Sequence, residues 1–294
     1  MYYKKNLRNA SIPYFFIAPC AVLIILIVIY PLTKGIIDSF LNINLLINRP
    51  LEFVGFGNFL SLFKDRLFGI AFYKSVIWTV TILIGEMVIG FSIAWLLNRD
   101  IKGRKVFRLI ILIPWVIPNI IAGIIWKWIY AEQYGLLNYF LNKLGVINGY
   151  KSWLGSSNTA FWAVLTVAIW KAIPFVVLVI LAALQSINKD LYEAAEVDGS
   201  NEIQKFFHIT LPSIKNITII IAILTSIWNF NQFEIIQVTT RGGPGTATLT
   251  MPIYSYELFL QSFQVSYASS AATIMLITMI VPMYFYIKSV LSEK

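Results

Sequence analysis

YEAAEVDGSNEIQKFFHITLP, residues 192–212, is the stretch that decides how the rest of the chain is interpreted. It carries four acidic side chains, Glu193, Glu196, Asp198 and Glu202, and long apolar runs lie on both sides of it. Charged side chains are costly inside a bilayer, so a polar stretch between two apolar runs of membrane-spanning length predicts a loop in water. The fold class that follows is an all-α integral membrane protein.

The order of residues in this loop predicts a short helix, a turn and a second helix. Asn188 or Asp190 can cap the first helix, and Gly199 permits the positive φ of a helix end. Asn201 begins the second helix, and Pro212 suits the start of the helix that re-enters the lipid. Two interpretations stay open at this point: an amphipathic loop that lies on the bilayer, or a surface that another protein approaches closely.

Composition independently indicates a membrane protein. Hydrophobic residues make up 58% of the chain and charged residues 13%, and the mean hydropathy is +0.74. The net charge of +9 does not predict nucleic-acid binding, because the basic residues follow the membrane topology instead of covering one soluble face. Five of them fall in one gap between apolar runs: Arg99, Lys102, Arg104, Lys105 and Arg108.

Six apolar runs are long enough to cross a membrane as helices. Each is near the roughly 20 residues that a helix needs to cross about 30 Å of hydrocarbon. They cover residues 12–30, 76–97, 106–130, 159–184, 217–238 and 268–290. The first run is long enough to span and no Ala-x-Ala site follows it, so we expect an uncleaved helix. Without visible repeats, we expect a single transmembrane domain over residues 1–294.

The distribution of Lys and Arg predicts the orientation. Six spans place both termini on the same side of the membrane. Basic residues are concentrated at the N-terminus and in the 99–108 gap, and such segments stay in the cytoplasm. We therefore expect a multi-pass protein of the cytoplasmic (inner) membrane with both termini and the loop at 188–212 in the cytoplasm.

The sequence lacks the common motifs of enzymes that hydrolyse nucleotides, esters or peptides. There is no phosphate-binding loop, no Gly-x-Ser-x-Gly, no His-Glu-x-x-His and only one histidine, His208. We expect neither an enzyme, nor a metal site, nor a cofactor. Glu86 and Lys171 lie near the middle of their runs, at membrane depth, where charge is costly. We interpret Glu86 as a buried structural group, and for Lys171 snorkelling toward the membrane surface and contact with a ligand both stay open.

Polar side chains are concentrated in the fifth apolar run. Thr225, Asn229 and Gln232 recur at spacings of four and three, so they share one face of a helix. Amide groups both donate and accept hydrogen bonds, and Trp228 and Phe175 add flat apolar faces. A sugar requires that combination of partners. Hydrogen bonding between helices is the alternative.

The cytoplasmic loop resembles the signature of a known family. The pattern Glu-Ala-Ala, three residues, Gly, nine residues, Ile, one residue, Leu-Pro is similar to that of the permease subunits of bacterial and archaeal ABC importers. It is met at Glu193, Ala194, Ala195, Gly199, Ile209, Leu211 and Pro212. The resemblance implies the type I ABC importer permease fold, in which this loop is a coupling helix that docks on a cytoplasmic ATPase subunit.

From about residue 107 onward the chain also resembles the larger, sugar-binding permease of importers for maltose, trehalose, other oligosaccharides and glycerol 3-phosphate. The shared pieces are IWKAIPF at 169–175, WNFNQF at 228–233 and GGP at 242–244. The resemblance implies a substrate path between the fourth and fifth spans. The residues that it places there are Lys171, Ala172, Phe175, Thr225, Trp228, Asn229 and Gln232.

The implied function is a permease subunit of an ABC importer for a disaccharide or oligosaccharide. The implied partners are a second homologous permease, two ATP-binding subunits that bind ATP and Mg, and an extracellular solute-binding protein. Two alternatives stay open. One is an ion-coupled secondary carrier that uses Glu86, Lys171 and Glu234, and the other is an ABC permease for a non-sugar solute such as glycerol 3-phosphate.

Overall fold

The computed structural model describes residues 12–47 and 50–292, and most of them are helical. The elements are α2 (Ile12–Ile24), η1 (Ile25–Ile29), α3 (Tyr30–Asp38), α4 (Gly57–Lys64), α5 (Arg66–Asn98), α6 (Arg104–Val116), α7 (Asn119–Ile129), α8 (Leu136–Lys143), α9 (Ala160–Gln185), α10 (Lys189–Val197), α11 (Glu202–Lys205), η2 (Phe206–Thr210), α12 (Leu211–Phe230), α13 (Glu234–Thr239), α14 (Met251–Tyr256), η3 (Glu257–Gln261) and α15 (Val265–Ser292). The η elements are π-helical turns. The predicted all-α class is confirmed.

Four of the described helical segments are long and apolar enough to cross a membrane: Tyr14–Asp38, Arg66–Asn98, Ala160–Gln185 and Glu202–Thr239. They overlap the runs predicted at 12–30, 76–97, 159–184 and 217–238. The run predicted at 268–290 lies in α15, within which Val265–Val281 forms an apolar helical segment shorter than these four. The count of six spans stays a prediction. The basic N-terminal residues on which the orientation depends lie outside the described residues.

The run predicted at 106–130 is not one straight helix. It forms α6 and α7, which meet at an angle of 98°. Pro118 explains the break, because proline has no N–H to continue a helix and disfavours the helical conformation of the residue before it. Ile117 accordingly has extended backbone angles, with φ −68° and ψ 127°. We refer to residues 114–119 as the α6–α7 corner.

The chain forms two compact units, one built from residues 1–65 and 255–281 and the other from residues 66–254 and 282–294. In the first unit, the segment after α3 is held to the start of α15 by hydrogen bonds. Ser266 Oγ accepts from Ile43 N at 2.8 Å, and Ser270 Oγ donates to Ser39 O at 3.0 Å. The expectation of one domain over the whole chain stays a prediction.

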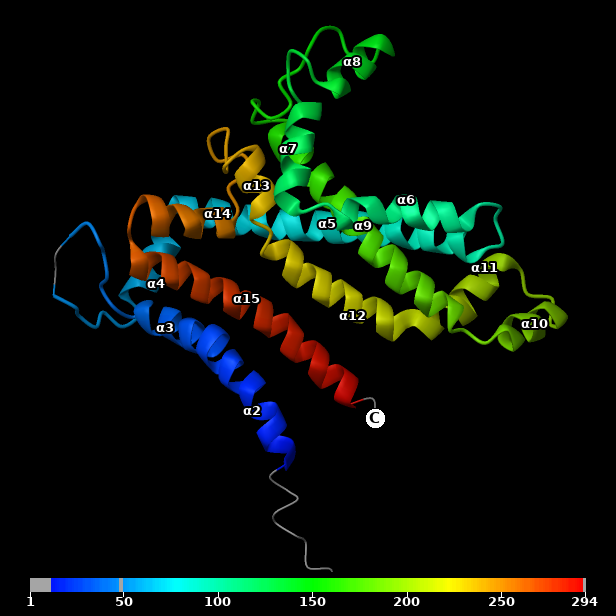
Figure 1. Cartoon of the computed structure of the whole chain (residues 1–294), viewed down its shortest axis with the longest axis horizontal. Coiled ribbons are helices and arrows are strands. Elements are labelled where there is room, and N and C mark those ends of the chain that lie inside the picture. The colour runs from blue at the N-terminus through cyan, green and yellow to red at the C-terminus, as the bar shows by residue number, and fades with distance from the viewer. Residues whose placement is uncertain (1–11, 48–49, 293–294) are drawn as a thin grey trace, which may run out of the picture. The chain divides into compact units, whose positions relative to one another are not determined.

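In the second unit, α5 and α9 lie side by side (Figure 1) and pack at short range. A Cβ atom added at Gly90 would lie 2.8 Å from Val176 Cγ1, and one at Gly85 would lie 2.8 Å from Ile169 Cδ1. Small residues allow this approach, which in lipid is stabilised by van der Waals contact rather than by the hydrophobic effect. The core that continues onto α12 includes Ala94, Val177, Ile180, Leu184, Ile214 and Ile221. These three helices frame the cavity described next.

Candidate functional site

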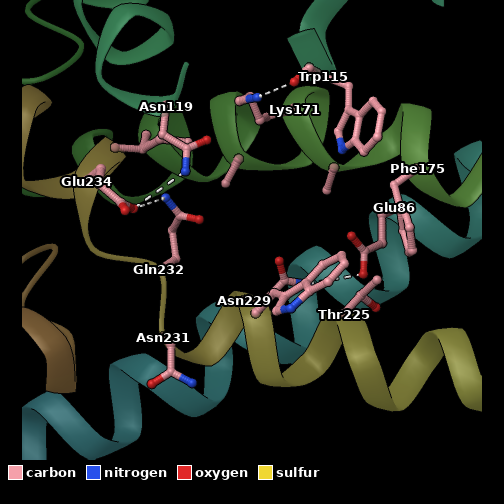
Figure 2. Close-up of a pocket in the computed structure, with 14 residues that line it drawn as sticks. Glu86, Trp115, Asn119, Lys171, Phe175, Thr225, Asn229, Asn231, Gln232 and Glu234 are labelled. Carbon is pink, nitrogen blue, oxygen red and sulfur yellow. Dashed lines mark hydrogen bonds between the residues drawn. The ribbon is translucent and has the colours of Figure 1, made fainter. Parts of the chain in front are cut away.

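A cavity of about 370 Å³ lies among α5, α9, α12, α13 and the α6–α7 corner (Figure 2). Its walls are mainly polar and aromatic. They are formed by Glu86, Trp115, Asn119, Ala168, Lys171, Ala172, Phe175, Thr225, Trp228, Asn229, Asn231, Gln232, Glu234 and Ile235. All seven side chains that the sequence assigns to a substrate path are in this set. The structure brings them together, and their role in transport stays a prediction.

Gln232 reaches the cavity in a different way from the one predicted. The spacing of Thr225, Asn229 and Gln232 predicts a common helical face, but α12 ends at Phe230, two residues before Gln232. Thr225 and Asn229 are buried within the helix, whereas Gln232 lies in the connection to α13. Its amide Nε2 is 3.5 Å from Glu234 Oε2. The connection therefore orients Gln232, and the helical periodicity does not.

Two aromatic rings give the cavity an apolar wall. The ring centroids of Phe175 on α9 and Trp228 on α12 are 5.0 Å apart in an edge-to-face arrangement. Trp115, at the end of α6, lies 6.5 Å from Phe175. Half of the Trp228 surface is exposed. The flat faces of these rings therefore lie next to amide groups that donate and accept hydrogen bonds.

Glu86 is a lining residue that the sequence analysis interpreted as structural and did not assign to the substrate path. It comes from the middle of α5, its side chain is fully buried, and its Oε1 accepts a hydrogen bond from Asn229 Nδ2 at 3.1 Å. Thr225 interacts with the same carboxyl. A lone carboxylate in an apolar run was the available signal, because such groups usually face a cavity or another helix.

Lys171 has partners that explain its position at membrane depth. Its Nζ donates to Pro114 O at 3.0 Å and to Trp115 O at 3.1 Å. Figure 2 shows the bond to Trp115. In a continuous helix Pro114 O would pair with the N–H of residue 118, but Pro118 has none. Lys171 supplies the missing donor, and a cation is also favourable at the C-terminal end of α6. The Lys171 ammonium is therefore already hydrogen-bonded to the α6–α7 corner, and whether it also contacts a ligand stays a prediction.

The loop at residues 188–212 has the predicted helix–turn–helix form. Asn188 caps α10 by accepting from Asp190 N, and Gly199 ends it with a φ of +78°. Asn201 and Gln204 form a reciprocal capping box at the start of α11. Pro212 lies in the first turn of α12. These features confirm the local prediction, and Figure 1 shows α10 and α11 joined by the turn.

Lys205 holds the two short helices of the loop together. Its Nζ lies 2.6 Å from Glu196 Oε1 on α10 and 3.2 Å from Glu202 Oε1 on α11, and only 9% of its side chain is exposed. Tyr192 Oη is also 2.8 Å from Thr210 Oγ1. Of the predicted coupling residues, Ala195 and Ile209 are half-buried. Glu193, Ala194, Gly199, Leu211 and Pro212 are exposed.

Among the described residues, no group of three or more His, Cys, Asp and Glu side chains is arranged to hold a metal ion. The carboxyl and ammonium groups of the cavity instead bond to neighbouring amide and carbonyl groups. The arrangement is suited to hydrogen bonding with a polar solute.

A family model for the binding-protein-dependent transport system inner membrane component matches residues 86–291. The sulfoquinovosyl glycerol transport system permease protein SmoG of Agrobacterium fabrum is 37% identical over 259 residues, which cover 88% of this chain and 83% of that protein. The trehalose/maltose transport system permease protein MalF of Thermococcus litoralis is 35% identical over 276 residues, which cover 93% of this chain and 92% of that protein.

The fold also matches a solved structure. A chain of a bacterial ABC transporter involved in the import of the acidic polysaccharide alginate superposes with a TM-score of 0.83, over 96% of this chain and 95% of that one. The two sequences are 23% identical, so this likeness supports the fold. The chain therefore belongs to the family of binding-protein-dependent transport system inner membrane components, as a multi-pass, non-catalytic permease subunit of an ABC importer.

Proposed function

We propose that the solute of this importer is a disaccharide or oligosaccharide and that the cavity is this subunit's part of its path. The observation that carries the proposal is the pair formed by Phe175 and Trp228, with ring centroids 5.0 Å apart, beside the amides of Asn229 and Gln232 in one cavity. Sugar rings have apolar faces and hydroxyl edges, so they bind where aromatic faces and amide groups converge.

The size of the cavity and the relatives support the same solute class. About 370 Å³ is near the lower end of the range of roughly 300–1,000 Å³ for small-molecule sites. It suits one or two sugar units, and a second homologous permease subunit completes the path. The two relatives described above are named for sulfoquinovosyl glycerol and for trehalose and maltose.

The helix–turn–helix loop is the docking site for an ATP-binding subunit. Val197 supports this role, because this apolar residue is 89% exposed in a polar segment, where a protein partner would cover it. Glu193 and Ala194 are exposed on the same helix. In this proposal two ATP-binding subunits bind ATP and Mg, an extracellular solute-binding protein delivers the sugar, and the loop and both termini lie in the cytoplasm.

The experiment is uptake of radiolabelled trehalose and maltose by proteoliposomes that contain the assembled importer. Asn229→Leu removes a buried amide from the cavity, and we expect uptake to fall about tenfold. Asn216→Leu is the matched control, since Asn216 is exposed elsewhere on α12. Both variants should retain the ATP-binding subunits in pull-down. Native uptake kinetics in Asn229→Leu would remove the cavity from the path.

A further inference from the structure

Glu86 has an unused hydrogen-bonding atom at the cavity. Its Oε1 accepts from Asn229 Nδ2, but Oε2 is buried and has no hydrogen-bond partner of ordinary geometry among residues 12–47 and 50–292. The neighbouring Thr225 hydroxyl lies 3.5 Å from the Ala222 carbonyl oxygen of its own helix. Figure 2 shows the carboxyl between Phe175 and Thr225. Thr225 is therefore the neighbouring hydroxyl that reaches this carboxyl, and Oε2 has no hydrogen bond of ordinary geometry.

An unpaired carboxyl oxygen in this position is costly. The Glu86 side chain has 0% exposure, so bulk water does not contact it. A buried acceptor without a donor loses its hydration and gains nothing in return, and the penalty is removed when a donor arrives. The close contacts of Gly85 and Gly90 with α9 fix the backbone on both sides of Glu86. The donor must therefore come to the carboxyl from the cavity.

The charged groups of the cavity restrict which donor that is. Two carboxyl groups, Glu86 and Glu234, face one ammonium group, Lys171. Two of the three ammonium hydrogens of Lys171 already bond to carbonyl oxygens of the α6–α7 corner. An anionic solute would lack cations to pair with and would meet carboxyl groups, whereas a neutral solute with hydroxyl groups would not.

We propose that Glu86 is a specificity-determining residue whose Oε2 accepts a hydrogen bond from one hydroxyl group of a neutral sugar. This inference rests on the proposed function. Because the carboxyl has no exposed surface in this conformation, lining side chains must move before the sugar reaches it. The bond between Asn229 and Glu86 Oε1 stays in place and keeps Oε2 directed at the hydroxyl.

Glu86→Gln separates this role from a structural one. The variant keeps the side-chain volume and one carbonyl oxygen for Asn229, but an NH₂ group that cannot accept a hydrogen bond replaces Oε2. In proteoliposomes with the assembled importer, we expect kcat/KM for trehalose or maltose to fall about ten- to a hundredfold. Glu132→Gln, on an exposed residue outside the cavity, is the control and should transport as the native protein does.

Monodeoxy analogues of the transported sugar complete the test. For the one analogue that lacks the bonded hydroxyl, native protein and Glu86→Gln should have equal kcat/KM. Native-like kinetics in the variant, or the same loss for every analogue, would overturn the role of Glu86 and leave the proposed function standing. Should Glu86→Gln assemble poorly, Glu86→Asp keeps both oxygens on a shorter side chain and should show a smaller loss with the same analogue dependence.

The native importer tests the proposed function separately. Uptake of trehalose or maltose, with glycerol 3-phosphate excluded, supports both the sugar assignment and the preference for a neutral solute. Uptake of glycerol 3-phosphate in place of both sugars would overturn the proposed function, and the inference about Glu86 with it.

Discussion

The ammonium group of Lys171 lies 3.0 Å from the carbonyl oxygen of Pro114 and donates a hydrogen bond to it. The bond joins α9 to the end of α6, at the point where Pro118 cannot supply an N–H. Trp115 and Asn119 flank this point and line the cavity. The shape of one cavity wall therefore depends on a side chain from another helix.

Lys171→Met should weaken the α6–α7 corner because it leaves two carbonyl groups without their donor. Lys171 is partly exposed and water can replace part of the lost bonding, so we expect a loss of about 1 kcal/mol in stability. The thermal unfolding midpoint of the purified importer should fall, and Lys171→Arg should restore part of it. Lys127→Met, at an exposed lysine on α7, is the control. Equal midpoints for Lys171→Met and native protein would contradict this assignment.

Gly90→Ala should disturb the contact between α5 and α9. The added Cβ would lie 2.8 Å from Val176 Cγ1 and 2.9 Å from Val176 Cβ, and a β-branched side chain has little freedom to move. We expect a destabilisation of about 1–3 kcal/mol. Gly69→Ala in the same helix has no atom within 4 Å of the new Cβ, so it should be neutral or slightly stabilising. The measurement is the thermal unfolding midpoint of both variants, and equal midpoints would contradict a close contact at Gly90.

Gly199→Ala should impair coupling through backbone strain alone. No atom lies within 4 Å of the added Cβ, but the φ of +78° costs a non-glycine residue about 1–2 kcal/mol. We expect a lower ratio of sugar transported to ATP hydrolysed, with a milder effect for Gly199→Asn. Gly145→Ala places the same strain, at φ +70°, in a loop elsewhere and should leave the ratio unchanged. A native ratio in Gly199→Ala would argue against a fixed loop shape.

Glu193→Lys reverses a charge on the exposed face of α10 and should uncouple ATP hydrolysis from uptake. The side chain is exposed and the substitution suits a helix, so membrane insertion and expression should stay normal. Pull-down of the ATP-binding subunits and uptake are the measurements. Glu132→Lys, an exposed charge reversal outside the loop, is the control. Normal uptake in Glu193→Lys would contradict docking at this helix.

The loop at residues 188–212 could be predicted in detail because its signals are local. Asn188, Gly199, Asn201 and Pro212 each act on the backbone within a few residues of their own position, and each has the predicted role. The family model also decides between two functions that the sequence alone left open, because it matches an ABC importer permease and not an ion-coupled carrier.

The cavity could be predicted only in part, because its geometry depends on contacts between distant residues. Glu86 meets Asn229 across 143 positions, and Lys171 meets Pro114 across 57. Periodicity assigns a face to each helix but does not say which helix lies opposite. The hydropathy of the run at 106–130 likewise does not distinguish a straight span from a broken one. Pro118 indicates where the helix breaks, but the sequence does not predict the 98° angle between α6 and α7.

The pairing of Lys205 with Glu196 and Glu202 has a mechanical consequence. It ties α10 to α11, and from Glu202 the chain continues through η2 to Phe230 as one helical segment. The proposed docking segment is thus joined to the cavity wall by ion pairs and a continuous helical segment. A displacement at Glu193 would reach Asn229 instead of being absorbed at the Gly199 turn. A movement of the ATP-binding subunit would therefore act directly on the wall of the cavity.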